Sequence, residues 1–149
     1  MKKDLSIKFT RIATRAAIVL SAVSLFVMPW AAKFYAWNVS IYGDDDIYVP
    51  LLITFYICAA AGFCILFILD RLVGNISKGD VFTDENVKFL RRLSYLCLFI
   101  ALVALIFSYF RFLSLIITFS ALFFALLLRV IKNCFEEAVR LKEENDYTI

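Results

Sequence analysis

The densest cluster of chemically active side chains is an acidic triplet, Asp44, Asp45 and Asp46. Carboxylates are ligands that Ca²⁺ prefers, so three of them together could attract a cation. Side chains that are adjacent in sequence converge on one ion only when a folded loop and further ligands hold them there. We therefore expect a solvated acidic loop, and the triplet predicts no metal site.

The other reactive side chains lack the partners that catalysis needs. The chain has no histidine, so no serine can be activated by a Ser-His-Asp triad. The four cysteines show no C-x-x-C spacing, which argues against a zinc site. The glycines are scattered and form no phosphate-binding loop. Asp80 and Glu85 could share acid–base work, but no third group supports them. We expect a protein that is not an enzyme and binds no cofactor.

The elements that position these residues are expected to be membrane helices. Of 149 residues, 63% are hydrophobic, which is well above the share in soluble domains. A helix needs about 20 apolar residues to cross a bilayer, and four runs approach this length: 13–32, 50–69, 93–110 and 112–128. Strands would leave backbone amides unpaired in hydrocarbon. The expected fold class is all-α, a single domain (1–149) that forms an integral membrane four-helix bundle, with cytoplasmic helical extensions of helices 3 and 4.

Two of these runs allow a second interpretation. The first follows a basic segment, as a cleaved signal peptide does. The run is long, however, and its end at Trp30, Ala31 and Ala32 lacks the small-residue pattern of a cleavage site, so a membrane helix is favoured. The last two runs are separated by Arg111 alone. This favours a tight external hairpin in which Arg111 reaches the lipid headgroups, with a re-entrant pair as the alternative.

The distribution of Lys and Arg predicts the orientation of the chain. If the runs cross the membrane in turn, 14 of the 16 basic residues lie on the side of the two termini, and only Lys33 and Arg111 lie on the other. Cytoplasmic segments carry the excess of positive charge. We predict a multi-pass protein of the bacterial inner membrane with both termini in the cytoplasm, an external loop over 33–49, and cytoplasmic segments over 70–92 and 129–149.

The segment 70–92 contains signals for the end of one helix and the start of the next. Gly74 and Asn75 predict the end of the second helix. Thr83 is a favourable N-cap, and Asp84 and Glu85 would lie in the first turn, where carboxylates stabilise the helix dipole. The third helix is therefore expected to begin near Asp84, before it enters lipid.

The last run is expected to continue as an amphipathic cytoplasmic helix to about Glu144. Apolar residues recur there at helical spacing, and Glu136 and Arg140 are spaced for an ion pair. This tail and the segment 79–92 hang from neighbouring helices. The two could pack on each other, dock a cytoplasmic protein, or present a basic patch to anionic lipid; these alternatives are compatible.

Two parts of this surface resemble a known family. Residues 82–93 (FTDENVKFLRRL) are similar to the central motif of a bacterial membrane family called domain of unknown function 2975, and residues 141–149 (LKEENDYTI) are similar to its usual C-terminus. Val81 stands where the family often has Pro, and Tyr147 where it more commonly has Leu. The arrangement of four spans, long external loop and tail extends the resemblance over essentially the whole chain.

The resemblance implies no enzymatic activity. Members of the family often lie beside a gene for a small helix-turn-helix regulator, which implies a membrane partner that holds or releases a transcription factor; this is an association and not a physical argument. We expect a non-enzymatic regulatory protein, with a small oligomeric transporter or channel as the alternative. The expected partners are the lipid bilayer, the regulator and further copies of the chain, with no direct binding to nucleic acid. The residues expected at the docking surface are Phe82, Asp84, Glu85, Asn86, Lys88, Arg91, Arg92, Phe135, Glu144, Asn145, Asp146, Thr148 and Ile149.

Overall fold

The computed structural model describes residues 2–40 and 47–146, which form four helices and no strand. They are α1 (Lys2–Ser40), α2 (Tyr48–Lys78), α3 (Asp84–Phe107) and α4 (Ser114–Asp146). All four are long and apolar enough to cross a membrane. The predicted all-α fold with four membrane helices is confirmed. The acidic triplet 44–46 and residues 147–149 lie outside the described residues.

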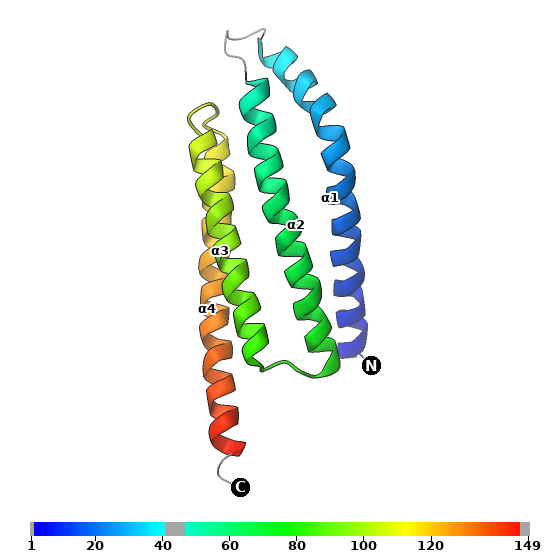
Figure 1. Ribbon diagram of the computed structural model, residues 1–149, viewed down its shortest axis with the longest axis vertical. Coiled ribbons are helices and arrows are strands. Elements are labelled where there is room, and N and C mark those ends of the chain that lie inside the picture. The colour runs from blue at the N-terminus through cyan, green and yellow to red at the C-terminus, as the bar shows by residue number, and fades with distance from the viewer. Residues whose placement is uncertain (1, 41–46, 147–149) are drawn as a thin grey trace.

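The helices run up and down beside one another (Figure 1). α1 packs on α2, α2 on α3, and α3 on α4, whereas the described parts of α1 and α4 do not pack together. The bundle is therefore open along one side. Both chain ends and the α2–α3 connection lie at one end of the molecule, which we call the basic end. The α3–α4 connection lies at the other end, which we call the hairpin end.

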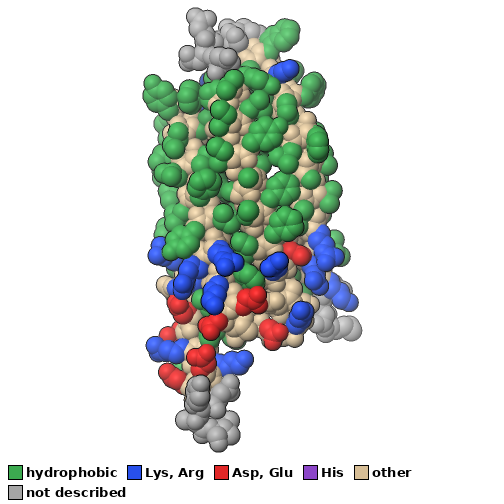
Figure 2. Space-filling view, in the orientation of Figure 1, with side chains coloured by type: hydrophobic (Ala, Val, Ile, Leu, Met, Phe, Trp, Pro, Cys, Tyr) green, Lys and Arg blue, Asp and Glu red, His purple; other side chains and the backbone are tan. Residues whose placement is uncertain are grey.

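Apolar side chains cover the helices between these two ends. Figure 2 shows hydrophobic side chains over most of the length of the molecule, and most of the Lys, Arg, Asp and Glu side chains gathered at the basic end. Many of the apolar side chains are large and open: Phe26 is 86% exposed and Phe112 is 81% exposed. Apolar surface of this extent is stable in hydrocarbon and not in water. The chain is a multi-pass membrane protein.

A proline within α1 is compensated by a neighbouring helix. Pro29 has no N–H, so the carbonyl of Leu25 loses its usual partner within α1. The hydroxyl of Tyr56 in α2 donates a hydrogen bond to that carbonyl over 3.2 Å. Because an unpaired carbonyl in hydrocarbon is costly, this bond ties α2 to α1 where α1 lacks a backbone bond.

Small residues let α3 and α4 approach closely. Ala101, Ala104 and Ala125 are almost fully buried in their contact. Ser94 donates its hydroxyl proton to the Ala125 carbonyl (2.9 Å), and Ser114 donates to the Ala104 carbonyl (2.7 Å). Small side chains and hydroxyl bonds between helices stabilise packing in lipid, where apolar burial contributes little. The α3–α4 hairpin is thus a tightly joined unit.

The end of α2 differs from the prediction. The helix does not stop at Gly74 and Asn75 but continues to Lys78, and it ends at Gly79, whose φ of 94° is left-handed. Glycine adopts this conformation without steric strain. Gly74 is helical because a neighbour supports it: the Arg11 side chain of α1 packs beside it, with Nη2 3.7 Å from the place of a Cβ.

Helix boundaries at the hairpin end also shift. α1 continues through residues 33–40, which were predicted as loop. One turn apart on this stretch, the rings of Trp30 and Phe34 stack with centroids 6.3 Å apart and support the helix. α3 ends at Phe107 and α4 begins at Ser114, so the chain reverses over six residues, 108–113. The tight hairpin around Arg111 is confirmed.

Candidate functional site

The connection between α2 and α3 begins with a hydrogen-bonded turn. The Gly79 N–H donates to the Ile76 carbonyl (3.2 Å), and the Asp80 N–H donates to the Asn75 carbonyl (3.1 Å). This pair of bonds is the Schellman arrangement, which satisfies carbonyls that the helix end would leave open. The turn therefore leaves α2 in a defined direction.

The start of α3 is capped as predicted. The Thr83 hydroxyl accepts a hydrogen bond from the Asn86 N–H, and the backbone of Thr83 is extended, as at other N-caps. Asp84 and Glu85 occupy the first turn, where their carboxylates lie near the positive end of the helix dipole. The expected start at Asp84 is confirmed.

Asn86 holds the turn together from inside. It is fully buried, at 0% exposed. Its Nδ2 donates to the carbonyls of Asp80 (2.7 Å) and Val81 (2.8 Å), and its Oδ1 accepts from Asn75 Nδ2 (3.0 Å). A fully satisfied polar group in a buried setting makes the surrounding backbone rigid. Asn86 was predicted to contact a partner, but it points into the protein and serves the turn.

Apolar side chains from three helices meet under this turn. The buried members are Leu72, Phe89, Leu90 and Leu93, and Leu128 and Phe135 of α4 pack against them. The Phe82 ring lies 5.4 Å from the Phe135 ring, between centroids. Val139, one turn further along α4, is also buried. The segment 79–92 and the tail therefore pack on each other, which was one of the predicted alternatives.

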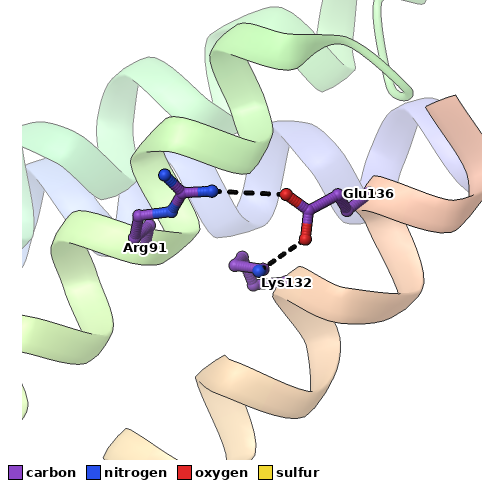
Figure 3. Close-up of polar contacts among 3 residues, drawn as sticks. All are labelled: Arg91, Lys132 and Glu136. Atoms are coloured by element: carbon purple, nitrogen blue, oxygen red, sulfur yellow. Dashed lines mark hydrogen bonds and ion pairs between the residues drawn. The ribbon is translucent and has the colours of Figure 1, made fainter. Parts of the chain in front are cut away.

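An ion-pair network fixes the tail against α3 (Figure 3). One carboxylate oxygen of Glu136 in α4 lies 3.3 Å from Arg91 Nη2 in α3, and the other oxygen pairs with Lys132 Nζ. The hydrogen bond from Lys132 and the positive charges of Lys132 and Arg91 hold the pKa of Glu136 below its ordinary value. Glu136 therefore stays ionised well into the acidic range.

The outer face of the tail carries its own ion pairs. The predicted pair of Glu136 with Arg140 is wrong, because Glu136 turns to α3. Arg140 instead contacts Glu137 (2.8 Å) and Glu144 (3.6 Å). Leu141 is 55% exposed beside these charges. The outer face is thus charged with an apolar centre.

The residues predicted for docking fall into three groups. The exposed ones are Phe82, Asp84, Glu85, Lys88, Arg91, Arg92, Glu144 and Asn145. Phe135 is half-buried in the apolar cluster, and Asn86 is buried. Thr148, Ile149 and the side chain of Asp146 lie outside the described part of the chain. The exposed group lies on two adjoining elements, the start of α3 and the end of α4.

A second polar site, which the sequence did not indicate, joins α1 to α2 at the basic end. Arg15 Nε lies 3.8 Å from Asp70 Oδ1. A hollow of about 220 Å³ lies beside them, and Arg11, Asn75 and Glu85 are among the residues that line it. Arg11 Nε and Asp70 Oδ1 are buried there without a hydrogen-bond partner. One open donor and one open acceptor in the same hollow suit a bridging water.

Sequence reasoning missed the roles of Asn75 and Arg11. Asn75 was interpreted as a helix stop, yet its amide donates to both Asn86 and Glu85, each over 3.0 Å. The available signal was a pair of asparagines on either side of a turn. Arg11 carried no such signal, because its neighbour Gly74 lies far along the chain.

The described residues offer binding chemistry at this end. None of them form a group of three or more His, Cys, Asp or Glu side chains that could hold a metal ion. Cys58, Cys64, Cys97 and Cys134 are all free. Exposed charges around a few exposed apolar side chains resemble the mixed composition of a protein–protein interface.

Comparison with known families places this architecture. Residues 30–149 match a family described as "Protein of unknown function (DUF2975)". The matched region takes in α2, α3, α4 and both motifs at the basic end. Comparisons with curated proteins and with solved structures found no match. Because the match covers most of the chain, this protein belongs to the DUF2975 family.

Proposed function

We propose that this protein is a non-enzymatic regulator in a bacterial cell membrane, and that its tail docks a small basic DNA-binding protein in the cytoplasm. The observation that carries the proposal is the α4 overhang, residues 133–146, which projects past the other helices (Figure 1). The helix rises by about 25 Å between Arg129 and Asp146. This length exceeds what the contacts with Phe82 and Arg91 require.

The charge of the α4 overhang suits such a partner. Residues 133–146 carry five carboxylates and only two basic side chains. Proteins that bind DNA present a basic face, so an acidic helix can occupy that face and compete with DNA. Leu141 and Phe82, at 55% and 45% exposed, supply apolar contacts beside these charges. Family members that lie beside a gene for a helix-turn-helix regulator support the same class of partner by association.

The distribution of basic residues supports a cytoplasmic location for the α4 overhang. Fourteen of the 16 Lys and Arg residues belong to the segments at the basic end, and positive charge is retained on the cytoplasmic side. A DNA-binding partner is found in the same compartment. Location and charge therefore agree.

A continuous helix offers a route from the membrane to the partner. α4 runs unbroken from Ser114 at the hairpin end to Asp146, and hydroxyl bonds of Ser94 and Ser114 join it to α3. A change in helix packing within the membrane would tilt the α4 overhang as part of the same rigid element. Release of the regulator would follow from that tilt.

Photo-crosslinking in the native host tests docking. A photoreactive amino acid at Lys142, which is exposed, should form an adduct with a small basic DNA-binding protein, identified by mass spectrometry. Reversing the charge of Glu143 and Glu144 to Lys should lower the yield about tenfold, since both charges would then repel a basic face. The same photoreactive group at Tyr109, 90% exposed at the hairpin end, is the matched control and should give no such adduct. Adducts with the regulator at both positions, or at neither, contradict the proposal.

The alternative, a small oligomeric transporter or channel, has less support. The runs 16–32, 50–69, 93–110 and 112–128 contain no Lys, Arg, Asp or Glu. Transporters coupled to ions or protons usually carry ionisable groups at membrane depth. Substrate-dependent flux in liposomes that contain the purified protein would favour transport over docking.

A further inference from the structure

A cavity lies near the hairpin end, on the open side of the bundle between α1 and α4. Its volume is about 670 Å³, which is within the range of ligand-binding pockets. The wall is almost wholly apolar, and it includes Met28, Ala31, Phe34, Phe107, Leu113 and Ile117. α1 and α4 are both needed to form it, although they do not pack on each other. An apolar body placed here would fill the space where a closed bundle has helix contacts.

A cationic side chain reaches this cavity. Of the described residues that line it, only Arg111 is charged. Arg111 is half-buried, and its Nε is fully buried without a hydrogen-bond partner. A charged donor left open in apolar surroundings is costly. Nε and the adjacent Nη of arginine form the fork that holds a phosphate or carboxylate through two parallel bonds. The open Nε therefore points to an anionic group as its partner.

The depth of the cavity corresponds to one leaflet of a bilayer. The lining residues of α1 extend from Met28 to Asn38, which is about 15 Å of helix and about half of a hydrocarbon core of about 30 Å. The walls lead onto the surface that faces lipid, since Phe34 is 66% exposed and Leu113 is 75% exposed. A molecule that enters from the side would come from the bilayer.

We propose that this cavity binds an anionic phospholipid from the surrounding leaflet, with an acyl chain along the apolar wall and the phosphate on the fork of Arg111. An acyl chain matches the shape and chemistry of the wall, and the phosphate supplies the missing partner of Nε. Arg111 lies at the hairpin end, at the depth where headgroups begin. The site stands whether or not the α4 overhang docks a regulator.

Tryptophan fluorescence offers a direct test, because both tryptophans of the chain, Trp30 and Trp37, lie on the stretch of α1 that borders the cavity. The full-length protein is reconstituted in nanodiscs that contain brominated phosphatidylglycerol, which is anionic, or brominated phosphatidylcholine, which is zwitterionic. We expect half-maximal quenching at an about tenfold lower mole fraction of the anionic lipid. This ratio is the anion preference used below.

Four variants assign the effect to the cavity. Arg111→Gln should abolish the anion preference and leave quenching by phosphatidylcholine unchanged. Arg111→Lys, which keeps the charge and loses the fork, should retain part of it. Arg129→Gln removes an exposed arginine at the other side of the membrane and should change nothing. Ala31→Phe should fill the cavity and reduce the anion preference, with the helix content in circular dichroism unchanged.

The proposal fails if the wild type shows no anion preference, or if the preference survives Arg111→Gln. It also fails if a brominated fatty acid displaces the anionic phospholipid, because the ligand would then be a free carboxylate. Disulfide crosslinking of Leu113→Cys between two copies in nanodiscs would show that a second copy covers the cavity, and this too would overturn it. Should Arg111→Gln fail to fold, Arg111→Lys decides, since full retention of the preference by Lys contradicts a role for the fork.

Discussion

At the scale of single residues, the side chain of Asn86 satisfies more backbone than its position in the sequence suggests. Its buried amide bonds the carbonyls of Asp80 and Val81 and the amide of Asn75. We expect Asn86→Ala to lower the free energy of unfolding by about 2–3 kcal/mol, because it leaves buried polar groups without partners. Unfolding in detergent, followed by circular dichroism, measures the change.

The matched control for this change is Asn133→Ala. Asn133 is exposed on α4, so its replacement should alter stability by no more than about 0.5 kcal/mol. Equal stability of the Asn86 and Asn133 variants would mean that the amide does not hold the turn.

A second residue-scale prediction concerns the carbonyl that Pro29 leaves open in α1. Removing the Tyr56 hydroxyl with Tyr56→Phe should destabilise the protein by about 1 kcal/mol, since Leu25 then has no partner in a region without water. Denaturant unfolding in mixed micelles measures the difference. Tyr95→Phe, at a tyrosine that is 57% exposed on α3, serves as the control and should have little effect.

A double-mutant cycle separates this hydrogen bond from general packing. Pro29→Ala restores an N–H to α1, which can bond the Leu25 carbonyl itself. In that background, Tyr56→Phe should be nearly neutral, and the coupling between the two changes measures the bond. The same loss in both backgrounds would show that Tyr56 acts only through its contacts.

What the sequence revealed at this scale depended on whether the partner was local. Thr83 was predicted as a cap because its acceptor role involves the N–H of Asn86 three residues on. The pairing of Asn86 with Asn75, and of Tyr56 with Leu25, joins different helices. No pattern along the chain reports such contacts until the helices are placed side by side.

At the scale of the elements, Glu136 links α4 to α3, and its ionisation should control how firmly the tail is held. Its pKa in the folded protein lies below the ordinary value, chiefly through the Lys132 hydrogen bond. A lowered pKa contributes stability that is complete above the ordinary pKa, about 4.3, and is lost as the pH falls through the folded value. The tail should therefore be held at neutral pH and loosen only in stronger acid.

Hydrogen exchange of the tail measures this contribution. At pH 7, Glu136→Gln should speed exchange in residues 133–146 by about two- to fivefold over the wild type, a modest effect because the pair is exposed. The difference should vanish below about pH 4, where the wild-type carboxylate is protonated too. Glu143→Gln, on the same exposed helix, is the control and should match the wild type at both pH values. A difference that persists in acid would show that Glu136 acts through packing and not through its charge.

The elements themselves were largely predictable, and their ends were less so. Four apolar runs of sufficient length determine four helices, because hydrocarbon leaves the backbone few other choices. The expected stop at Gly74 and Asn75 was wrong since local helix-ending signals were outweighed by contacts with Arg11 and Asn86. The start at Asp84 was right because the signals there are local.

At the scale of the whole molecule, the open side between α1 and α4 could not be predicted from the sequence. Apolar surface is as stable against lipid as against another helix, so hydrophobic burial does not force a bundle to close. Closure depends on small residues and hydrogen bonds, which α3 and α4 have in Ala104 and Ala125 with their serine partners. The cavity beside Arg111 follows from this uneven packing.

The orientation of the whole molecule is tested by the accessibility of one thiol. Cys134 is exposed at the basic end, whereas the other three cysteines lie within the apolar runs. If positive charge is retained in the cytoplasm, a membrane-impermeant maleimide should leave Cys134 unlabelled in sealed cells and label it after permeabilisation. The readout is a mass shift of the purified chain.

Lys33→Cys in a Cys134→Ser background provides the matched control, because Lys33 is exposed near the hairpin end, on the opposite side of the membrane. It should be labelled equally before and after permeabilisation. Labelling of Cys134 in sealed cells would place the α4 overhang outside, where no DNA-binding protein could reach it. Docking would then be excluded, whereas the lipid site at Arg111 would remain open to test, since it depends on the depth of the cavity and not on which leaflet faces the cytoplasm.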